Sequence, residues 1–314
     1  MLSIDYPMRR SGLAIIVAVI AVSFSSIFVR WSGAEPLAIA FYRLLFTTLL
    51  LLPFVLMNRG GELKALDKKN VGLMLGIGLV LSFHFSMWIT SLGLTSVASS
   101  VILVTAHPIL VGTVSHFFMK DKLSKLNFAG IFLAIFGVAV LTLGDFSGGP
   151  LTGSRTLGNI LAFLGGICAG IYILGGRTMR RTVSVVTYAF LVYLFCTIFL
   201  FIQCLATSTT LFPLPSNEYY LFLLMALIPG IMGHTLYNWS LKHVTATVVS
   251  VSLLGEPIGS SILAVLLLGE IPSRFVIIGG PIVLAGILMA SMRAGKKGKR
   301  LVHEAAARDG TLGV

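Results

Sequence analysis

The sequence predicts an all-α integral membrane protein of ten transmembrane helices, arranged as two inverted five-helix repeats with both termini in the cytoplasm. The chain of 314 residues has a mean hydropathy of +0.98 and is 56% hydrophobic but only 11% charged. Soluble domains carry about 25% charged residues. Ten apolar stretches are close to the length of about 20 residues that crosses a bilayer. A single shift of 149 residues superimposes the first five stretches on the last five.

The first repeat occupies residues 11–144 and the second occupies residues 157–293. The predicted spans of the first repeat lie near 11–30, 36–57, 71–93, 96–118 and 126–144. Those of the second lie near 157–176, 184–205, 218–241, 245–268 and 274–292. Residues 294–314 form a basic tail that we expect in the cytoplasm.

Identical or similar residues recur at the shift of 149, at positions that determine the geometry of the helices. They pair Pro108 with Pro257, Gly130 with Gly279, Gly137 with Gly286, and Asp121 with Glu270. Because each repeat has an odd number of spans, the second must insert upside down. Inverted repeats of this kind are typical of carriers whose binding site lies near the middle of the membrane.

Positive charge predicts the orientation, because Lys and Arg collect on the cytoplasmic side. With the N-terminus inside, 19 of the 23 Lys and Arg residues are cytoplasmic, Arg43 lies within a span, and three lie outside: Arg30, Arg155 and Arg274. The net charge of +12 therefore follows from topology and predicts no nucleic-acid partner. We expect a multi-pass protein of the cell membrane, monomeric or homodimeric, whose partners are the lipid bilayer and a small-molecule substrate.

The first span also has features of a signal peptide, since basic residues precede it and small residues follow it. Its apolar stretch exceeds the roughly 7–15 residues of a signal sequence. Loss of this span would leave the sixth span without a repeat partner, so the sequence favours a retained helix.

Ionisable residues inside predicted spans cost about 2.5–3.5 kcal/mol each and are seldom kept without a role. They are Arg43, His84, His107, His116, His234 and Glu256. Arg43 has no counterpart in the second repeat, where Val192 takes its place. Two interpretations stay open: a fixed charge that binds a substrate carboxylate or a carboxylate gate, and a structural charge tied to Glu256 or to backbone carbonyls.

Two prolines mark candidate gating positions. Glu256 precedes Pro257 in the ninth span, and His107 precedes Pro108 at the matching place in the fourth. Proline removes a helical hydrogen bond and kinks the helix. Together with His234, these residues are candidates for gating or proton coupling. A carboxyl that only stabilises the kink is the alternative for Glu256.

Aromatic and polar side chains one helical turn apart complete the candidate substrate site. His84 and Trp88 share a face of the third span, while Tyr237 and Asn238 follow His234 in the eighth. Aromatic rings with polar neighbours suit an amphipathic ligand, although helix packing also explains them. The predicted substrate-binding residues are Arg43, His84, Trp88, His107, Tyr237, Asn238 and Glu256.

Glycine pairs four residues apart predict close helix contacts at Gly72 with Gly76 and at Gly166 with Gly170. The cysteines, Cys168, Cys196 and Cys204, all lie in spans and have no metal-ligand spacing. No phosphate loop, metal cluster or nucleophile motif is evident, so we expect no cofactor, no metal and no enzymatic activity.

Two stretches resemble a known family. AVSFSSIFVRWSGAEPLAIAFYRLLFTTLLLLP at 21–53 is similar to the opening of the EamA branch of the drug/metabolite transporter superfamily, including the Arg in the second span. LLGEPIGSSILAVLLLGEIP at 253–272, with GGPIVLAGILM at 279–289, resembles its second-half signature. The resemblance implies ten helices, an inverted-repeat fold and transport of metabolites such as amino acids, often outward.

One arginine inside the membrane disfavours phosphorylated cargo, which needs several basic residues. Amino acids or related amphipathic compounds fit better. The alternatives are a drug or cation efflux carrier and a facilitative uniporter, both of the same fold. A channel fits the sequence less well than these carriers but better than an intramembrane enzyme does.

Overall fold

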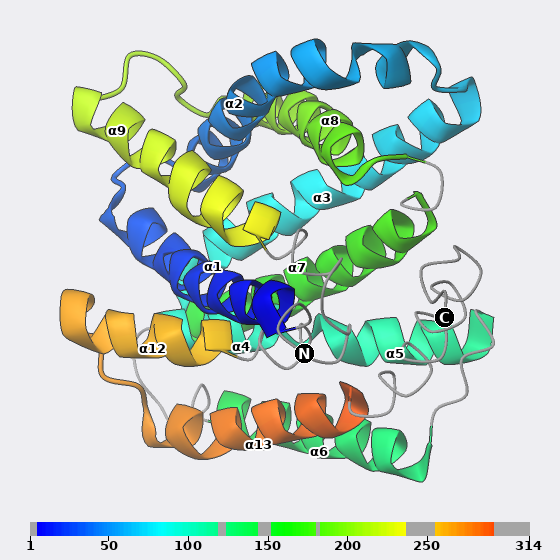
Figure 1. Ribbon diagram of the computed structural model, residues 1–314. Helices are drawn as coiled ribbons and strands as arrows, with labels where there is room; N and C mark the ends of the chain where they lie inside the picture. The colour runs from blue at the N-terminus through cyan, green and yellow to red at the C-terminus, as the bar shows by residue number, and fades with distance from the viewer. Residues whose placement is uncertain (1–4, 119–123, 144–151, 180–182, 237–254, 292–314) are drawn as a thin grey trace, which may run out of the picture.

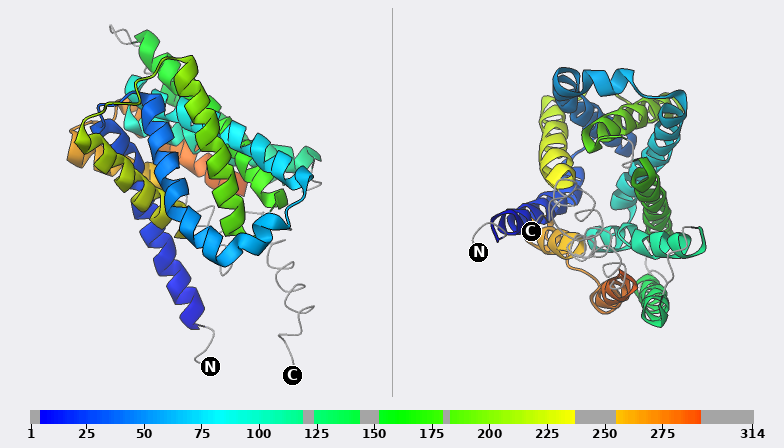
Figure 2. Two further views of the ribbon diagram at one scale, coloured as in Figure 1. Left: turned by 90° about the horizontal axis from the view of Figure 1, so that it is seen from above. Right: turned by 45° about the vertical axis from the view of Figure 1, so that its right-hand side comes forward.

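The computed structural model describes residues 5–118, 124–143, 152–179, 183–236 and 255–291, and every regular element in these ranges is a helix. In the first half these are α1 (Asp5–Trp31), α2 (Pro36–Lys64), α3 (Lys68–Leu94), α4 (Val97–Val104), α5 (His107–Phe118) and α6 (Lys125–Leu143). In the second half they are α7 (Thr152–Met179), α8 (Val185–Ala206), α9 (Ser216–Met225), the π-helix η2 (Ala226–Thr235), α12 (Gly255–Leu268) and α13 (Arg274–Ser291). Figure 1 shows their arrangement, and in Figure 2 the helices run side by side as one bundle.

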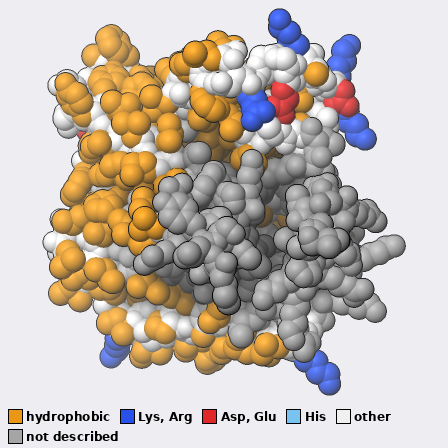
Figure 3. All heavy atoms as spheres, in the orientation of Figure 1, with side chains coloured by type: hydrophobic (Ala, Val, Ile, Leu, Met, Phe, Trp, Pro, Cys, Tyr) orange, Lys and Arg blue, Asp and Glu red, His pale blue; other side chains and the backbone are white. Residues whose placement is uncertain are grey.

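Five of the described helices are long and apolar enough to cross a membrane, namely α1, α2, α3, α7 and α8. Shorter apolar helices overlap four of the other predicted spans, at Val97–Leu110, Lys125–Leu141, Gly255–Leu268 and Arg274–Ala290. Large apolar side chains face outward, with Phe132 70% exposed and Leu266 72% exposed. Hydrophobic side chains cover much of the described surface in Figure 3, whereas Lys and Arg lie at its edges. Such a surface suits lipid as its solvent.

The fourth predicted span is two helices rather than one kinked helix. Thr105 and Ala106 separate α4 from α5, so Pro108 lies in the first turn of a new helix. Proline is well tolerated there because the missing N–H has no partner in a first turn. Pro257 likewise lies in the first turn of α12, while the predicted span before Gly255 lies outside the described residues.

Contacts at the α6–α13 interface repeat when the halves are exchanged. A methyl group added to Gly130 would lie 2.7 Å from the carbonyl oxygen of Gly286, and one added to Gly279 would lie 2.8 Å from that of Gly137. The shift of 149 residues converts the first contact into the second. The helices approach closely because glycine has no side chain to separate them.

A second contact of this kind joins α2 to α8. The hydroxyl oxygens of Thr48 and Thr197, which are 149 residues apart, lie 3.5 Å from each other and are buried. Helices α3 and α7 also pack together, and so do α1 and η2, which occupy the corresponding places in the opposite halves.

One of the two predicted glycine pairs makes close contacts. A methyl group on Gly166 would lie 2.8 Å from the carbonyl oxygen of Val104, and one on Gly170 would lie 3.0 Å from Leu110. The prediction for Gly72 and Gly76 is wrong, because nothing in the structure lies within 4 Å of a methyl group at either position. Both positions are exposed in the described structure.

Candidate functional site

Arg43 is the buried charge at the centre of the candidate site. Its side chain on α2 is 3% exposed, and its Nη1 donates a hydrogen bond of 2.7 Å to the hydroxyl of Ser25 on α1. Thr47 donates to the Arg43 carbonyl oxygen at 2.8 Å, one turn further along α2. A guanidinium has five N–H donors, and Ser25 is the one hydrogen-bond partner it has among the residues that the structure describes.

Two aromatic rings of α3 form a wall beside the Arg43 guanidinium. Its central carbon lies 4.9 Å from the ring centroid of Phe85 and 5.6 Å from that of Trp88. Cation–π contacts of this length stabilise a desolvated guanidinium. The indole N–H of Trp88 is buried and has no hydrogen-bond partner within the described part of the chain. A buried donor left unpaired costs about 1–3 kcal/mol, so this N–H is suited to a ligand acceptor.

His84 extends the aromatic wall towards α7. Its ring stacks on Trp88 with centroids 6.1 Å apart and planes 10° apart, and its Nδ1 lies 2.9 Å from the Gly165 carbonyl oxygen. Gly165 lies close to α3, since a methyl group there would be in van der Waals contact with the backbone of Trp88, at 3.4 Å from its nitrogen. The α3–α7 packing therefore fixes the orientation of both rings.

Glu256 approaches the site from α12, which packs on α1. Ser260, one turn after Glu256, donates a hydrogen bond of 3.1 Å to the Ser23 carbonyl oxygen. Glu256 interacts electrostatically with Arg43, but the two do not form an ion pair within 4 Å. In the described ranges, the one ion pair of that length is Arg30 with Glu270. Arg43 and Glu256 are thus near enough to interact but not in direct contact.

The π-helix η2 brings His234 towards the same centre. Its backbone packs on α1 and α2, since a methyl group on Gly233 would meet Val22 at 2.6 Å and one on Gly230 would meet Thr47 at 3.0 Å. His234 interacts electrostatically with Arg43 and His84. Segments of π-helix occur often at functional sites, which agrees with its position here.

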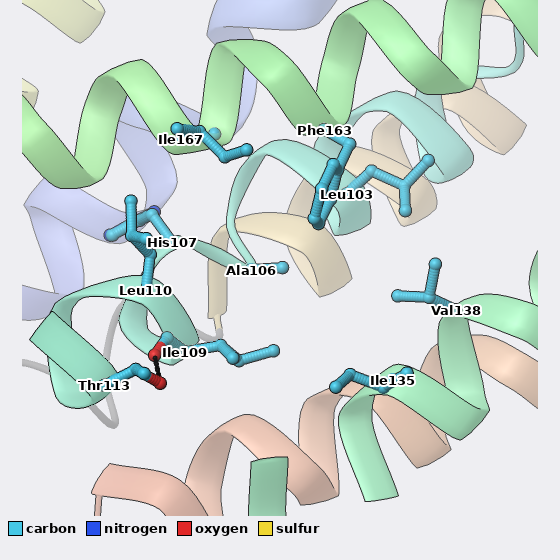
Figure 4. Close-up of a pocket in the computed structure, with 11 residues that line it drawn as sticks. Leu103, Ala106, His107, Ile109, Leu110, Thr113, Ile135, Val138, Phe163 and Ile167 are labelled. Atoms are coloured by element: carbon cyan, nitrogen blue, oxygen red, sulfur yellow. Dashed lines mark hydrogen bonds between the residues drawn. The ribbon is translucent and has the colours of Figure 1, made fainter. Parts of the chain in front are cut away.

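His107 lies at the start of α5. Its Nδ1 lies 3.3 Å from the carbonyl oxygen of Val104 at the break between α4 and α5. Figure 4 shows its ring at a cavity of about 280 Å³ bordered by α4, α5, α6 and α7. It interacts electrostatically with His84 but makes no described contact with Arg43.

The structure therefore brings together Arg43, His84, Trp88, His234 and Glu256 of the residues predicted from sequence. Tyr237 and Asn238 lie outside the described residues. Sequence reasoning missed Ser25 and Phe85, which contact Arg43, and the α8 residues Tyr193 and Cys196, which lie near it. Phe85 adjoins His84 in sequence, and Tyr193 follows Val192, the repeat counterpart of Arg43, but the repeat alone does not place either residue beside Arg43.

A second group of polar contacts lies at the C-terminal end of α1. Arg30 donates to the Leu92 carbonyl oxygen at 2.7 Å and to Glu270 Oε2 at 3.2 Å. Glu270 Oε1 accepts a hydrogen bond of 2.7 Å from the backbone N–H of Val97, at the start of α4. Nearby, Glu218 accepts from the Gly33 backbone N–H at 2.9 Å and from the Ser32 hydroxyl. These bonds tie α1 to α3, α4, α9 and the segment after α12.

Comparison with known proteins agrees with a membrane transporter. "Uncharacterized transporter YyaM" of Bacillus subtilis (strain 168) is 25% identical over 244 residues, covering 76% of this chain and 78% of that protein. An "Uncharacterized transporter" of Archaeoglobus fulgidus is 25% identical over 293 residues, covering 90% and 96%. A crystal structure covers 93% of this chain and 99% of its own, with a TM-score of 0.62 and 19% identity, and so shares the fold.

The EamA-like transporter family matches two stretches of this sequence, residues 10–143 and 156–292. Together they span most of the 314 residues. The chain is therefore a multi-pass membrane protein that belongs to the EamA-like transporter family, within the drug/metabolite transporter superfamily.

Proposed function

We propose that this protein is a secondary carrier that exports amino acids or related amphipathic metabolites across the cell membrane by alternating access. The observation that carries the proposal is the buried Arg43 guanidinium, which has one described hydrogen bond, lies beside an aromatic wall and interacts electrostatically with Glu256. In a bilayer, ionisable groups kept away from lipid commonly mark substrate pathways.

The two halves support alternating access. Contacts related by the 149-residue shift, at Thr48 with Thr197 and at Gly130 with Gly286, are those expected where a pseudo-two-fold axis relates opposed repeats. We infer ten helices in two inverted repeats with cytoplasmic termini. Repeats of this kind offer two near-equivalent packings, each open to one side of the membrane.

The site suits a zwitterion with an apolar part. Arg43 and the unpaired Trp88 N–H supply donors for a carboxylate, and Glu256 supplies a partner for an ammonium group. The faces of Phe85 and His84 are suited to an apolar side chain. A phosphorylated substrate fits less well, because Arg43 is the one Lys or Arg in this cluster among the described residues.

Counterflow in proteoliposomes tests the proposal. A panel of labelled amino acids and amphipathic cations is loaded inside, and unlabelled compound outside drives exchange. Saturable exchange of an amino acid is expected. Flux that rises linearly with concentration and shows no counterflow indicates a channel and overturns the carrier.

The role of each charged group is tested with matched analogues of the transported compound. Arg43→Gln should raise KM for the carboxylate compound at least tenfold and leave its amide analogue nearly unchanged. Trp88→Phe keeps the ring but removes the N–H, so a smaller rise limited to the carboxylate compound is expected. Arg59→Gln, at the cytoplasmic end of α2, is the control.

A cation efflux carrier is the second candidate, and Glu256 favours it. If amphipathic cations exchange and amino acids do not, this alternative replaces the first. Proton coupling through Glu256 is tested separately. If protons are coupled through Glu256, the Glu256→Gln variant should lose the pH dependence of transport. If the variant transports normally with an unchanged pH dependence, proton coupling through Glu256 is excluded.

A further inference from the structure

The cavity beside His107 shares no lining residue with the described contacts of Arg43. It is bordered by Leu103 of α4, Leu110 of α5, Val138 of α6 and Phe163 of α7, as Figure 4 shows. Its volume of about 280 Å³ is nearly twice that of the roughly 150 Å³ apolar cavity that binds benzene. This volume therefore suits an apolar ligand larger than a benzene ring.

Two polar side chains line this cavity, and each has an atom within hydrogen-bond distance of a backbone carbonyl three or four residues earlier in the chain. The Thr113 hydroxyl donates to the Ile109 carbonyl oxygen at 2.8 Å, which is the dashed line in Figure 4. His107 Nδ1 lies against the Val104 carbonyl oxygen. The remaining described side chains of the lining are apolar, so the cavity offers few partners to water, which needs two to four.

The cavity opens at the middle of two membrane helices. Ile135 and Phe163 border it and are 55% and 45% exposed. Ile135 lies near the centre of α6 and Phe163 near the centre of α7. Exposed apolar side chains surround this opening, including Phe132 and Phe136 on α6 and Ile160 and Leu164 on α7. The opening is thus continuous with the lipid-facing surface, at a depth that hydrocarbon chains reach and headgroups do not.

We propose that this cavity is a lipid-binding site that takes the middle of one acyl chain of a bilayer phospholipid. An apolar space that opens into hydrocarbon gains dispersion contacts when a chain fills it. The bound chain would lie against the α4–α5 break and against Gly166, where α7 crosses Val104 at close range. The bound chain would thus pack against the break between α4 and α5 on the side that faces lipid.

Photolabelling in proteoliposomes tests the site. The probe is a phosphatidylcholine with a diazirine in the middle of one acyl chain, and labelled residues are mapped by mass spectrometry. Labelling of Ile109, Leu110 and Thr113 is expected, several-fold above that of Ile198 and Ile202, which are exposed on α8. A diazirine attached to the headgroup should not label α5 at these positions.

Two variants fill the cavity from different helices, Val138→Phe on α6 and Leu110→Phe on α5. Each should lower labelling of Thr113 at least threefold. Ala139→Phe adds the same bulk to the next position of α6, which is exposed and does not line the cavity, and should leave labelling unchanged. Labelling of Thr113 that persists in both filled variants, or that equals the α8 background in the unmodified protein, overturns the proposal.

Discussion

A buried arginine in a membrane helix needs partners for its donors, and the sequence identifies Arg43 but not those partners. Its depth in an apolar span is evident from residues 36–57. Its contacts come from α1 and α3, through Ser25, Phe85 and Trp88. No periodicity along one helix predicts which faces of other helices meet it. The same limit applies to His107, whose place among the substrate contacts stays a prediction.

Glycine contacts give the sharpest prediction at the scale of one residue. Gly130→Ala places a methyl group 2.5 Å from the Ala290 backbone nitrogen and 2.7 Å from the Gly286 oxygen. Backbone atoms of a helix cannot yield as a flexible side chain can, so overpacking should cost about 1–3 kcal/mol. The change is measured as the free energy of unfolding in detergent micelles.

Gly76→Ala is the matched control, because nothing lies within 4 Å of its added methyl group. Alanine forms helices better than glycine by about 1 kcal/mol, so this variant should be as stable as the parent or slightly more stable. Equal losses in Gly130→Ala and Gly76→Ala would contradict the α6–α13 contact.

At the scale of elements, Glu62 fixes the start of α8 from the end of α2. Its Oε1 accepts from the Ser184 N–H at 2.6 Å, and its Oε2 accepts from the Ser184 and Thr187 hydroxyls at 2.7 and 2.8 Å. Hydrogen bonds to charged groups contribute about 1.5–3 kcal/mol. Glu62→Ala should therefore lower the free energy of unfolding by about 1–3 kcal/mol.

Glu62→Gln keeps one acceptor oxygen and should lose less stability than Glu62→Ala. Chemical denaturation of both variants in detergent measures the difference. If the two variants are as stable as the parent, Glu62 does not hold α8.

The contacts of Arg30 predict that α1 and Glu270 separate during transport. With the proposed topology, Arg30 and Glu270 lie on the outer side, where they tie α1 to the start of α4. Opening of this side requires their separation. A short bifunctional thiol reagent that joins Arg30→Cys to Glu270→Cys, in a background free of Cys168, Cys196 and Cys204, should abolish counterflow.

Release of the link by a reducible version of the reagent should restore counterflow. The single-cysteine variants treated in the same way are the controls. Full transport by the linked protein would show that this side stays closed throughout the cycle.

At the scale of the whole molecule, the charge distribution predicts orientation. In the proposed ten-span topology, nineteen of the 23 Lys and Arg residues fall on the side of the N-terminus, so the C-terminus should be cytoplasmic. A green fluorescent protein fused after Val314 should fluoresce, and alkaline phosphatase fused there should be inactive. Fusions to the segment between Ala206 and Ser216 should give the opposite result; the reverse pattern would contradict the proposed topology.

The sequence by itself determined the class of this protein. Bilayer hydrocarbon imposes one length and one polarity on every crossing segment, so the apolar stretches and the 149-residue shift are readable along the chain. Family membership followed from motifs in both halves. The isolated Arg43 was visible for the same reason, as a charge where charge is costly.

Only the tertiary structure decided which residues meet. It left Gly72 and Gly76 without close contacts and broke the fourth span at Thr105 and Ala106. Lipid is as apolar as the core, so hydropathy does not distinguish a helix face that packs from one that faces lipid. Shape complementarity between two helices decides which faces pack. It is a property of a pair of helices and cannot be read from one stretch of sequence.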